Sequence, residues 1–348
     1  MTQENTAPAV NPHGQVRPAW LAQVQEAPID PMRPIIDAHH HLWLREHYPY
    51  LMDGFAADLG CGHNIRQTVY IESLAMHRAI GPGYLRPVGE TEFANGQAAI
   101  AASGLIGPTL ACAGIVTYAD LRREDAPAQL DAHLVAGNGR LRGVRQISAW
   151  HAHDAVKGTS QSPPQGLLSD PDFRRGFAEL ARRGLSFDAW LYFTQLDELA
   201  ALAKAFPDTM IALDHVGGPL GVGPYAGQRE VVAQAWQEAL HGLKTLPNVY
   251  IKLSGLGMRT AGFDFHTRKL PPTSTELATA WQPYFDFCIE TFGPGRCMFA
   301  SNFPVDKGTC SYAVLWNAHQ RIVAAYSSAE QDQLFHHTAQ AFYRLAAY

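Results

Sequence analysis

Eight short apolar segments, alternating with stretches of helical periodicity, constrain the fold of this chain more than any other feature. Each segment is rich in β-branched or aromatic residues and is bounded by turn residues or a polar cluster; they cover 34–38, 67–72, 112–118, 141–147, 186–192, 210–216, 249–255 and 296–300. Near-continuous hydrophobic runs are typical of parallel strands that are buried on both faces. We therefore predict an α/β fold, a (β/α)8 barrel. A doubly wound open sheet is the alternative, but no G-x-G-x-x-G turn follows the first strand.

Helix signals separate the predicted strands. Asp170-Pro171 is typical of an N-cap and a first helical position, and Gly184 of a helix end. Further helices are predicted over 196–206, 230–243, 274–292, 312–326 and 329–345. Residues 93–119 carry no charge, but glycine and proline interrupt them. We expect a helix, a turn and a buried strand there rather than a membrane span.

Charge and cysteine content exclude several classes of partner and location. Lys plus Arg number 27 against 32 for Asp plus Glu, and no basic run exceeds two residues, so a nucleic acid partner is not expected. The five cysteines include no C-x-x-C pair, and no secretory signal is visible, so we expect a cytoplasmic protein. We expect residues 1–33 to form an extension that packs over the bottom of the barrel or is partly loose, and residues 34–348 to form the barrel domain. The oligomeric state is not readable from the sequence.

The strongest local motif is Asp37-Ala38-His39-His40-His41-Leu42-Trp43, at the end of the first predicted strand. Because side chains alternate along a strand, Asp37, His39 and His41 are predicted to share one face. If that face is the barrel interior, His39 and His41 meet at the C-terminal mouth, where barrel enzymes have their active sites. Two such imidazoles can hold one metal ion or polarise a carbonyl without metal. A surface histidine cluster is the alternative.

Two further motifs end predicted strands. Ile211, Leu213 and His215 share a parity, which makes His215 the last inward residue before a glycine turn, although a lone strand histidine is more often structural. Asn302 lies at the C-terminal end of the last predicted strand, where its side chain would face the mouth of the barrel. An amide cannot act as a base. Asp306, one short loop further on, is either that base or a loop partner of Lys307.

Other strand ends supply candidate substrate-binding residues. Arg145 could clamp a carboxylate or form an ordinary ion pair. Glu72 is a carboxylate at a buried strand end, which needs a partner or a metal. Trp190 and Tyr192 form either a pocket wall or plain core. Lys252 is unusual on a barrel strand, and we include it among the candidates.

The three motifs at 37–43, 213–219 and 301–304, in this order and spacing, resemble the amidohydrolase superfamily and its amidohydrolase-2 branch. The resemblance covers about residues 34–348 and implies a distorted (β/α)8 barrel. That branch includes 2-pyrone-4,6-dicarboxylate lactonase and sugar lactonases, and more distantly decarboxylases. By this resemblance the first-strand H-x-H is His39 and His41, the sixth-strand histidine is His215, and Arg145 binds substrate.

The sequence departs from the family pattern at two ligand positions. The eighth-strand aspartate, the general base of the family, falls on Asn302, and 188–192 offer no fifth-strand histidine. The resemblance therefore leaves open one divalent metal, zinc or manganese, on His39, His41 and His215, or a metal-free site. The base would be Asp306, or else the first-strand histidines with Glu72.

These features together predict a hydrolase that opens a small, carboxylated lactone from the breakdown of aromatic compounds. A metal-dependent non-oxidative decarboxylase is the first alternative, and it would need a metal chelated by the substrate. A non-catalytic binder of small molecules is the second.

Overall fold

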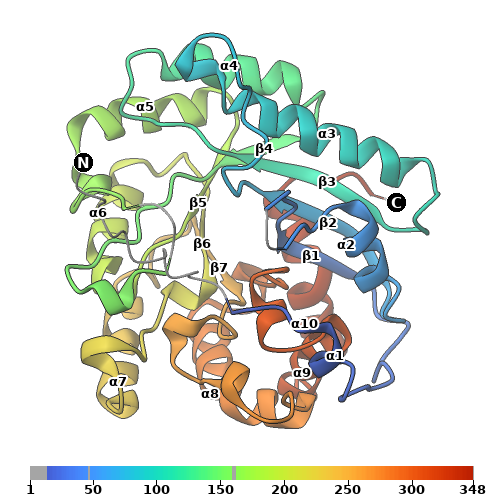
Figure 1. Cartoon of the computed structure of the whole chain (residues 1–348). Coiled ribbons are helices and arrows are strands. Elements are labelled where there is room, and N and C mark those ends of the chain that lie inside the picture. Colours follow the sequence, from blue (N-terminus) through green and yellow to red (C-terminus); the bar gives the residue numbers. More distant parts are fainter. Residues whose placement is uncertain (1–13, 46–47, 159–161, 348) are drawn as a thin grey trace, which may run out of the picture.

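The computed structural model describes residues 14–45, 48–158 and 162–347 and confirms the predicted barrel. Eight parallel strands follow one another around a nearly closed sheet, each paired with the next in the chain, and helices surround them (Figure 1). The strands are β1 (Ile35–His40), β2 (Ile65–Ile71), β3 (Leu110–Thr117), β4 (Leu141–Val144), β5 (Ser186–Ala189), β6 (Ile211–Leu213), β7 (Val249–Leu253) and β8 (Cys297–Phe299). Each overlaps one predicted segment.

The barrel closes between its last and first strands. The closing hydrogen bonds run from the amide of His41 to the carbonyl of Phe303 over 2.7 Å and from the amide of Asn302 to the carbonyl of His39 over 2.8 Å. An isolated parallel bridge joins His40 to Phe303. The first and third motifs of the sequence therefore meet as neighbouring backbone segments.

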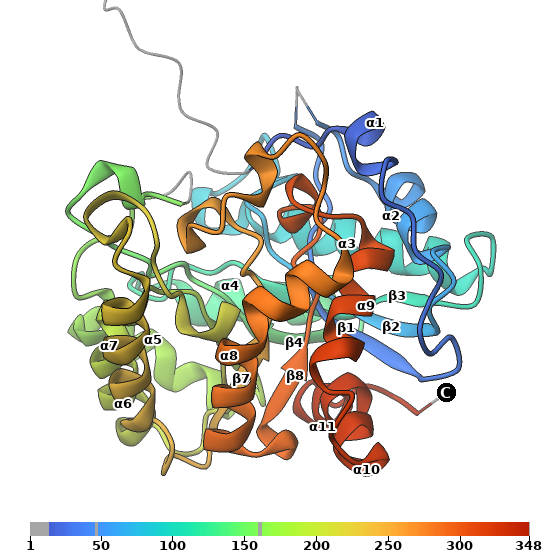
Figure 2. The same cartoon turned by 90° about the horizontal axis from the view of Figure 1, so that it is seen from below.

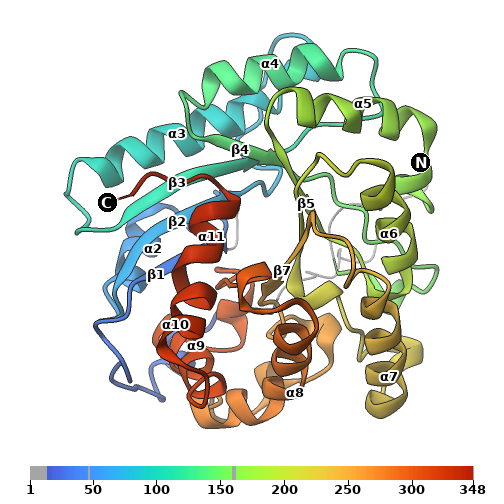
Figure 3. The same cartoon turned by 180° about the vertical axis from the view of Figure 1, so that it is seen from behind.

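Two apolar layers hold the barrel together. Inside it, Ile36, Val69, Val116 and Met298 belong to a buried cluster that also includes Phe342 near the C-terminus. The alternate strand residues belong to a larger cluster with the surrounding helices. The C-terminal helix α11 (Thr338–Phe342) contacts β1 and β8, and Figure 3 shows it beside β1. The interior is thus a packed core below the mouth.

The helices largely follow the predictions. The longer ones are α2 (Met52–Leu59), α3 (Val88–Ala102), α4 (Ala126–Ala136), α5 (Pro171–Arg182), α6 (Leu196–Ala205), α7 (Arg229–His241), α8 (Ser274–Phe292) and α9 (Tyr312–Ile322). Asp170 caps α5 by accepting from the amides of Asp172 and Phe173. The predicted helix over 329–345 is instead divided into α10 (Ser328–Asp332), a π-helical turn over 333–337, and α11.

The uncharged stretch over 93–119 folds as expected, because α3, a turn and β3 account for it. Within the described residues, no helix is both long enough and apolar enough to cross a membrane.

The described part of the N-terminal extension packs at the mouth of the barrel, and not over its bottom as one of our expectations had it. Trp20, in the short helix α1 (Pro18–Leu21), donates from Nε1 to the carbonyls of Arg268 and Lys269, which lie between β7 and α8. Gly14 lies against Gly308 in the loop after β8. Figure 2 shows α1 at the opposite end of the molecule from α10 and α11. The extension therefore borders the loops that surround the site.

Candidate active site

A pocket opens at the C-terminal ends of the strands. It is lined by one side chain following each of β1, β2, β4, β5, β6 and β8, namely His41, Glu72, Arg145, Trp190, His215 and Asn302. Loop residues, among them Trp43, Arg45, Met258 and Val305, complete its wall. The structure thus brings six of the predicted site residues into one cavity.

His215 faces this pocket because of its backbone conformation, and not because of the strand alternation that we predicted. Ile211 and Leu213 belong to the outer cluster with the helices, whereas Ala212 lies in the inner cluster, so strand parity points Asp214 inward. His215 itself has φ of 55°, in the left-handed region, beyond the end of β6. The prediction failed because it extended strand alternation past Leu213.

Asp37 also departs from the predicted face. Its carboxylate accepts from the amide and hydroxyl of Ser301, at 2.8 Å and 2.6 Å, and from the hydroxyl of Tyr312 on α9 at 2.9 Å. The register of β1 shifts between Asp37 and His40, which breaks the alternation that the prediction assumed. Asp37 therefore links β1, β8 and α9 and is not part of the pocket wall.

His39 and His41 form a contacting pair beside the pocket. Their Nε2 atoms lie 3.1 Å apart, and Nδ1 of His41 donates to the carbonyl of Ile71 over 2.8 Å. His41 lines the pocket, whereas His39 is fully buried and lies outside the described pocket wall. Burial lowers the pKa of both imidazoles well below the usual value, and Lys252 lowers that of His39 further. Both rings are therefore neutral at physiological pH.

Lys252 lies beneath His39 and does not face the substrate pocket, although it was predicted to bind substrate. Its ammonium is fully buried, 2.5 Å from Oδ2 of Asp188, 3.0 Å from Oδ1 of Asp214 and 3.2 Å from Nδ1 of His39. Burial alone would raise the pKa of Asp214, but Lys252 and His39 hold it well below the usual range. The hydroxyl of Tyr343 also donates to Asp188, over 2.8 Å.

Tyr192, another predicted substrate contact, is not in the wall of this pocket. It is buried, and its hydroxyl donates to the carbonyl of Val156 over 2.8 Å and accepts from the amide of Gly158 over 3.0 Å. Trp190 does line the pocket, with its ring 4.8 Å from that of His215. Of the two aromatic candidates, the structure places only Trp190 in the pocket wall.

One side of the Arg145 guanidinium is hydrogen-bonded to Glu72. Its Nε donates to Oε1 of Glu72 over 2.7 Å, and its Nη2 donates to the backbone carbonyl of Glu72 over 2.6 Å. Its Nη1 lies 3.4 Å from Nε2 of His39 and 3.6 Å from Oδ2 of Asp214. Arg145 thus forms the ion pair that was one of its two predicted roles, and Glu72 engages its Nε and Nη2.

Asn302 connects the pocket to Asp306. Its Nδ2 donates to Oδ1 of Asp306 over 2.9 Å, and the amide of Gly257 donates to Oδ2 over 3.3 Å. Burial raises the pKa of Asp306 to about 7. Lys307 pairs with Asp58 instead, at 2.6 Å, so the alternative in which Asp306 is a loop partner of Lys307 is wrong.

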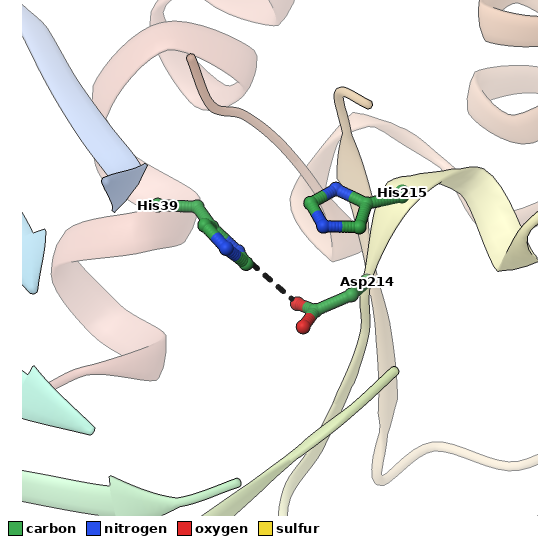
Figure 4. Close-up of side chains that lie close together, drawn as sticks. All are labelled: His39, Asp214 and His215. Atoms are coloured by element: carbon green, nitrogen blue, oxygen red, sulfur yellow. Dashed lines mark ion pairs between the residues drawn. The ribbon is translucent and has the colours of Figure 1, made fainter. Parts of the chain in front are cut away.

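Among the residues that the structure describes, one group of side chains is close enough together to hold a metal ion. It consists of His39, Asp214 and His215, whose ligand atoms lie within 4.8 Å of one another (Figure 4). Two imidazoles and a carboxylate suit zinc, and the group differs from the predicted set by Asp214 in place of His41. His39 and Asp214 already contact Lys252 and Arg145, so a divalent cation here would face two fixed positive charges. The donors fit a metal and the surrounding charge does not, so no step of the reaction is derived through one.

Sequence reasoning missed the charged residues below the pocket. Asp188 and Asp214 lie on β5 and directly after β6, and Tyr343 follows α11. The available signal was the occurrence of Asp188 and Lys252, of opposite charge, inside apolar strand segments, because buried charges require partners. Tyr343 offered no such signal, since its contact depends on how the C-terminal helix packs.

The fold and the pocket define a barrel enzyme with its site at the strand ends, and comparison with known proteins gives its family. A family model described as Amidohydrolase matches residues 36–345. The chain therefore belongs to the amidohydrolase family and is a hydrolase.

Known relatives and solved structures agree with this assignment. The uncharacterized protein y4mH of Sinorhizobium fredii is 38% identical over 89% of this chain and 98% of its own length. L-fucono-1,5-lactonase of Burkholderia ambifaria is 26% identical over 78% of this chain and 81% of its own length. A crystal structure of an amidohydrolase from Burkholderia multivorans with bound zinc is similar in fold, with a TM-score of 0.69, 24% identity, and coverage of 90% of this chain and 99% of that one.

Proposed function

We propose that this protein hydrolyses a small lactone. The observation that carries the proposal is the convergence of Arg145, His215 and Asn302 on one pocket, with Asn302 hydrogen-bonded to Asp306. Arg145 and His215 can stabilise negative charge, and the carboxylate of Asp306 can accept a proton. The similarity to L-fucono-1,5-lactonase supports the same reaction class.

Arg145 and His215 polarise the ester carbonyl. Nη1 of Arg145 is the guanidinium nitrogen that Glu72 does not use. Nδ1 of His215 lies 3.0 Å from the hydroxyl of Ser254, and when that hydroxyl donates, the ring carries its proton on Nε2. Burial lowers the pKa of His215 to about 3, so the ring acts as a neutral donor. Donors aimed at the carbonyl oxygen stabilise the oxyanion as charge develops.

Asp306 accepts the proton of the attacking water. The water oxygen forms a bond to the carbonyl carbon while its proton passes to the carboxylate. The ring C–O bond of the tetrahedral intermediate then breaks, and the proton returns to the departing alkoxide. A pKa of about 7 suits both transfers near neutral pH. Glu72, which lines the pocket and whose Oε1 accepts from Arg145, is the alternative proton acceptor.

Arg45 is the cation that would recognise an acidic substituent on the lactone. It lines the pocket, and its guanidinium lies over the ring of Trp43, 3.8 Å from the ring centroid. Because Nε and Nη2 of Arg145 already donate to Glu72, we assign recognition of a carboxylated lactone to Arg45. This substrate class, and with it a place in aromatic-compound breakdown, is part of the proposal.

A lactone panel tests the proposal. It contains L-fucono-1,5-lactone, L-rhamnono-γ-lactone and 2-pyrone-4,6-dicarboxylate, with acid release followed at constant pH for the wild type and Arg45→Met. Opening of a lactone supports the function, and a higher KM of Arg45→Met for the carboxylated compound alone supports the role of Arg45. Carbon dioxide release from aromatic acids, or saturable binding without turnover, would replace the proposal with the decarboxylase or the binder.

A further inference from the structure

We infer that Lys252 is a positioning residue: it sets the direction of the hydrogen bond between His39 and His41, so that the pair is held without a metal ion. The inference does not depend on the proposed function. The evidence is a row of hydrogen bonds that determines which nitrogen of each neutral imidazole carries the proton. Ile71 lies at one end of the row and Lys252 at the other.

The first end is the carbonyl of Ile71. A carbonyl oxygen only accepts, so Nδ1 of His41, 2.8 Å away, must carry a proton. Neutral His41 then has a lone pair on Nε2. Because that atom lies 3.1 Å from Nε2 of His39, the proton between the two rings belongs to His39.

The second end is Lys252. An ammonium only donates, so Nδ1 of His39, 3.2 Å from Nζ, must accept. Neutral His39 then carries its proton on Nε2, in agreement with the conclusion drawn from the contact with Ile71. The hydrogen bonds run in one direction, from Lys252 through His39 and His41 to the carbonyl of Ile71.

Two other contacts favour the opposite tautomer and are weaker by distance. Oδ1 of Asp214 lies 3.4 Å from Nδ1 of His39, farther than Lys252, and it has Lys252 as a partner at 3.0 Å. Nη1 of Arg145 lies 3.4 Å from Nε2 of His39. If His39 carried its proton on Nδ1 instead, that proton would point at an N–H of Lys252.

Lys252 is itself held rigidly. Asp188 accepts its hydrogen bond at 2.5 Å, and the hydroxyl of Tyr343 donates to the same carboxylate oxygen over 2.8 Å. The side chains of Lys252 and Asp188 are fully buried. Because Tyr343 belongs to the C-terminal segment, the end of the chain contributes to holding the ammonium under the active site.

This arrangement opposes metal binding at the same rings. A metal ion on Nε2 of His39 needs the lone pair that the proton occupies, and a shift of that proton to Nδ1 would set it against Lys252. Removal of the ammonium, as in Lys252→Met, lifts this restriction and also leaves Asp214 without its nearest cation. We therefore expect the variant to bind zinc more strongly than the wild type.

The direct test is nitrogen NMR of the full chain with labelled histidine, with His39→Gln used to assign the His39 signals. In the wild type we expect the His39 signal of a ring protonated at Nε2, and elemental mass spectrometry should find less than about a tenth of a zinc per chain at equilibrium with micromolar zinc. A His39 ring protonated at Nδ1, or one zinc per chain lost in His39→Gln, would overturn the inference. Neither measurement involves substrate, so failure here is distinguishable from failure of the lactonase proposal.

Variants of Lys252 extend the test. Lys252→Met should gain zinc and shift the His39 signals toward the other tautomer. Lys252→Arg, which keeps a cationic donor, should exclude zinc. If Lys252→Met does not fold, Tyr343→Phe, which removes only the hydroxyl that holds Asp188, should shift the His39 signals toward the other tautomer. Unchanged signals in every folded variant would contradict the role of Lys252.

Discussion

Asn302 donates a hydrogen bond from Nδ2 to Oδ1 of Asp306 over 2.9 Å, so the strand-end position of β8 carries an amide that is bonded to a carboxylate four residues later. Asn302 lines the pocket and Asp306 lies directly behind it. The family resemblance puts the base at the position of Asn302. In this protein an amide takes that position in the pocket wall, and its nearest carboxylate partner is Asp306.

On the acidic side of its pH profile, kcat/KM should follow the deprotonation of Asp306. Burial raises its pKa to about 7. A base must be deprotonated to act, so kcat/KM should rise tenfold per pH unit below about pH 7 and level off above it. Initial rates across this range provide the measurement. A profile that is flat from about pH 5.5 to about pH 8.5 would show that Asp306 is not the base.

Gly255 is required by the position of His215. A Cβ on Gly255 would lie 2.5 Å from Cβ and Cγ of His215, and the residue has φ of +76°. Gly255→Ala should displace the imidazole and lower kcat/KM at least about tenfold, since a misplaced catalytic group loses its alignment. Gly139→Ala is the matched control, because Gly139 has φ of +78° with no atom within 4 Å of the added Cβ. Both should lose about 1–2 kcal/mol of stability from the backbone, and equal activity in the two variants would contradict this account of His215.

The ion pair between Arg145 and Glu72 should contribute measurably to the free energy of unfolding. Arg145→Met leaves the buried carboxylate of Glu72 without its partner, and we expect a loss of about 3–5 kcal/mol in the free energy of unfolding. In the double variant Glu72→Gln with Arg145→Met, no charge is stranded at that position, and the loss should be smaller. Denaturant titration of the wild type, Arg145→Met and the double variant gives the comparison. A double variant less stable than Arg145→Met would argue against this explanation.

Trp20 should anchor the N-terminal extension to the mouth. It is buried, and its indole bonds the carbonyls of Arg268 and Lys269. Trp20→Ala should free this segment locally, so limited proteolysis should cut residues 14–30 faster while the barrel stays intact. Gln23→Ala, an exposed change in the same region, is the control. Equal cleavage rates in the two variants would mean that Trp20 does not hold the extension.

The sequence was informative wherever local chemistry decided the outcome. Apolar strand segments separated by helices fixed the barrel, and motifs at strand ends predicted the pocket positions of His41, His215 and Asn302, because parallel strands bring their C-terminal ends to one mouth. The errors have specific physical causes. Strand parity failed at His215, where the backbone enters the left-handed region, and at Asp37, where the β1 register shifts.

Contacts between segments that are distant along the chain could not be predicted from the sequence. The placement of Lys252 under His39, 213 residues apart, and of Tyr343 against Asp188, 155 residues apart, depends on tertiary packing that no local pattern encodes. The same applies to Arg145, whose two predicted roles differed only in whether Glu72 lay close enough to occupy its fork.

The most direct test of the account compares acid release by the wild type and Asp306→Asn, at constant pH, on the lactone that the panel identifies. The substitution preserves size and removes the proton acceptor, so kcat/KM should fall about 10²–10⁴-fold with the fold intact by circular dichroism. Wild-type turnover with this loss supports lactone hydrolysis with Asp306 as base. Turnover by Asp306→Asn within about twofold of the wild type would contradict it.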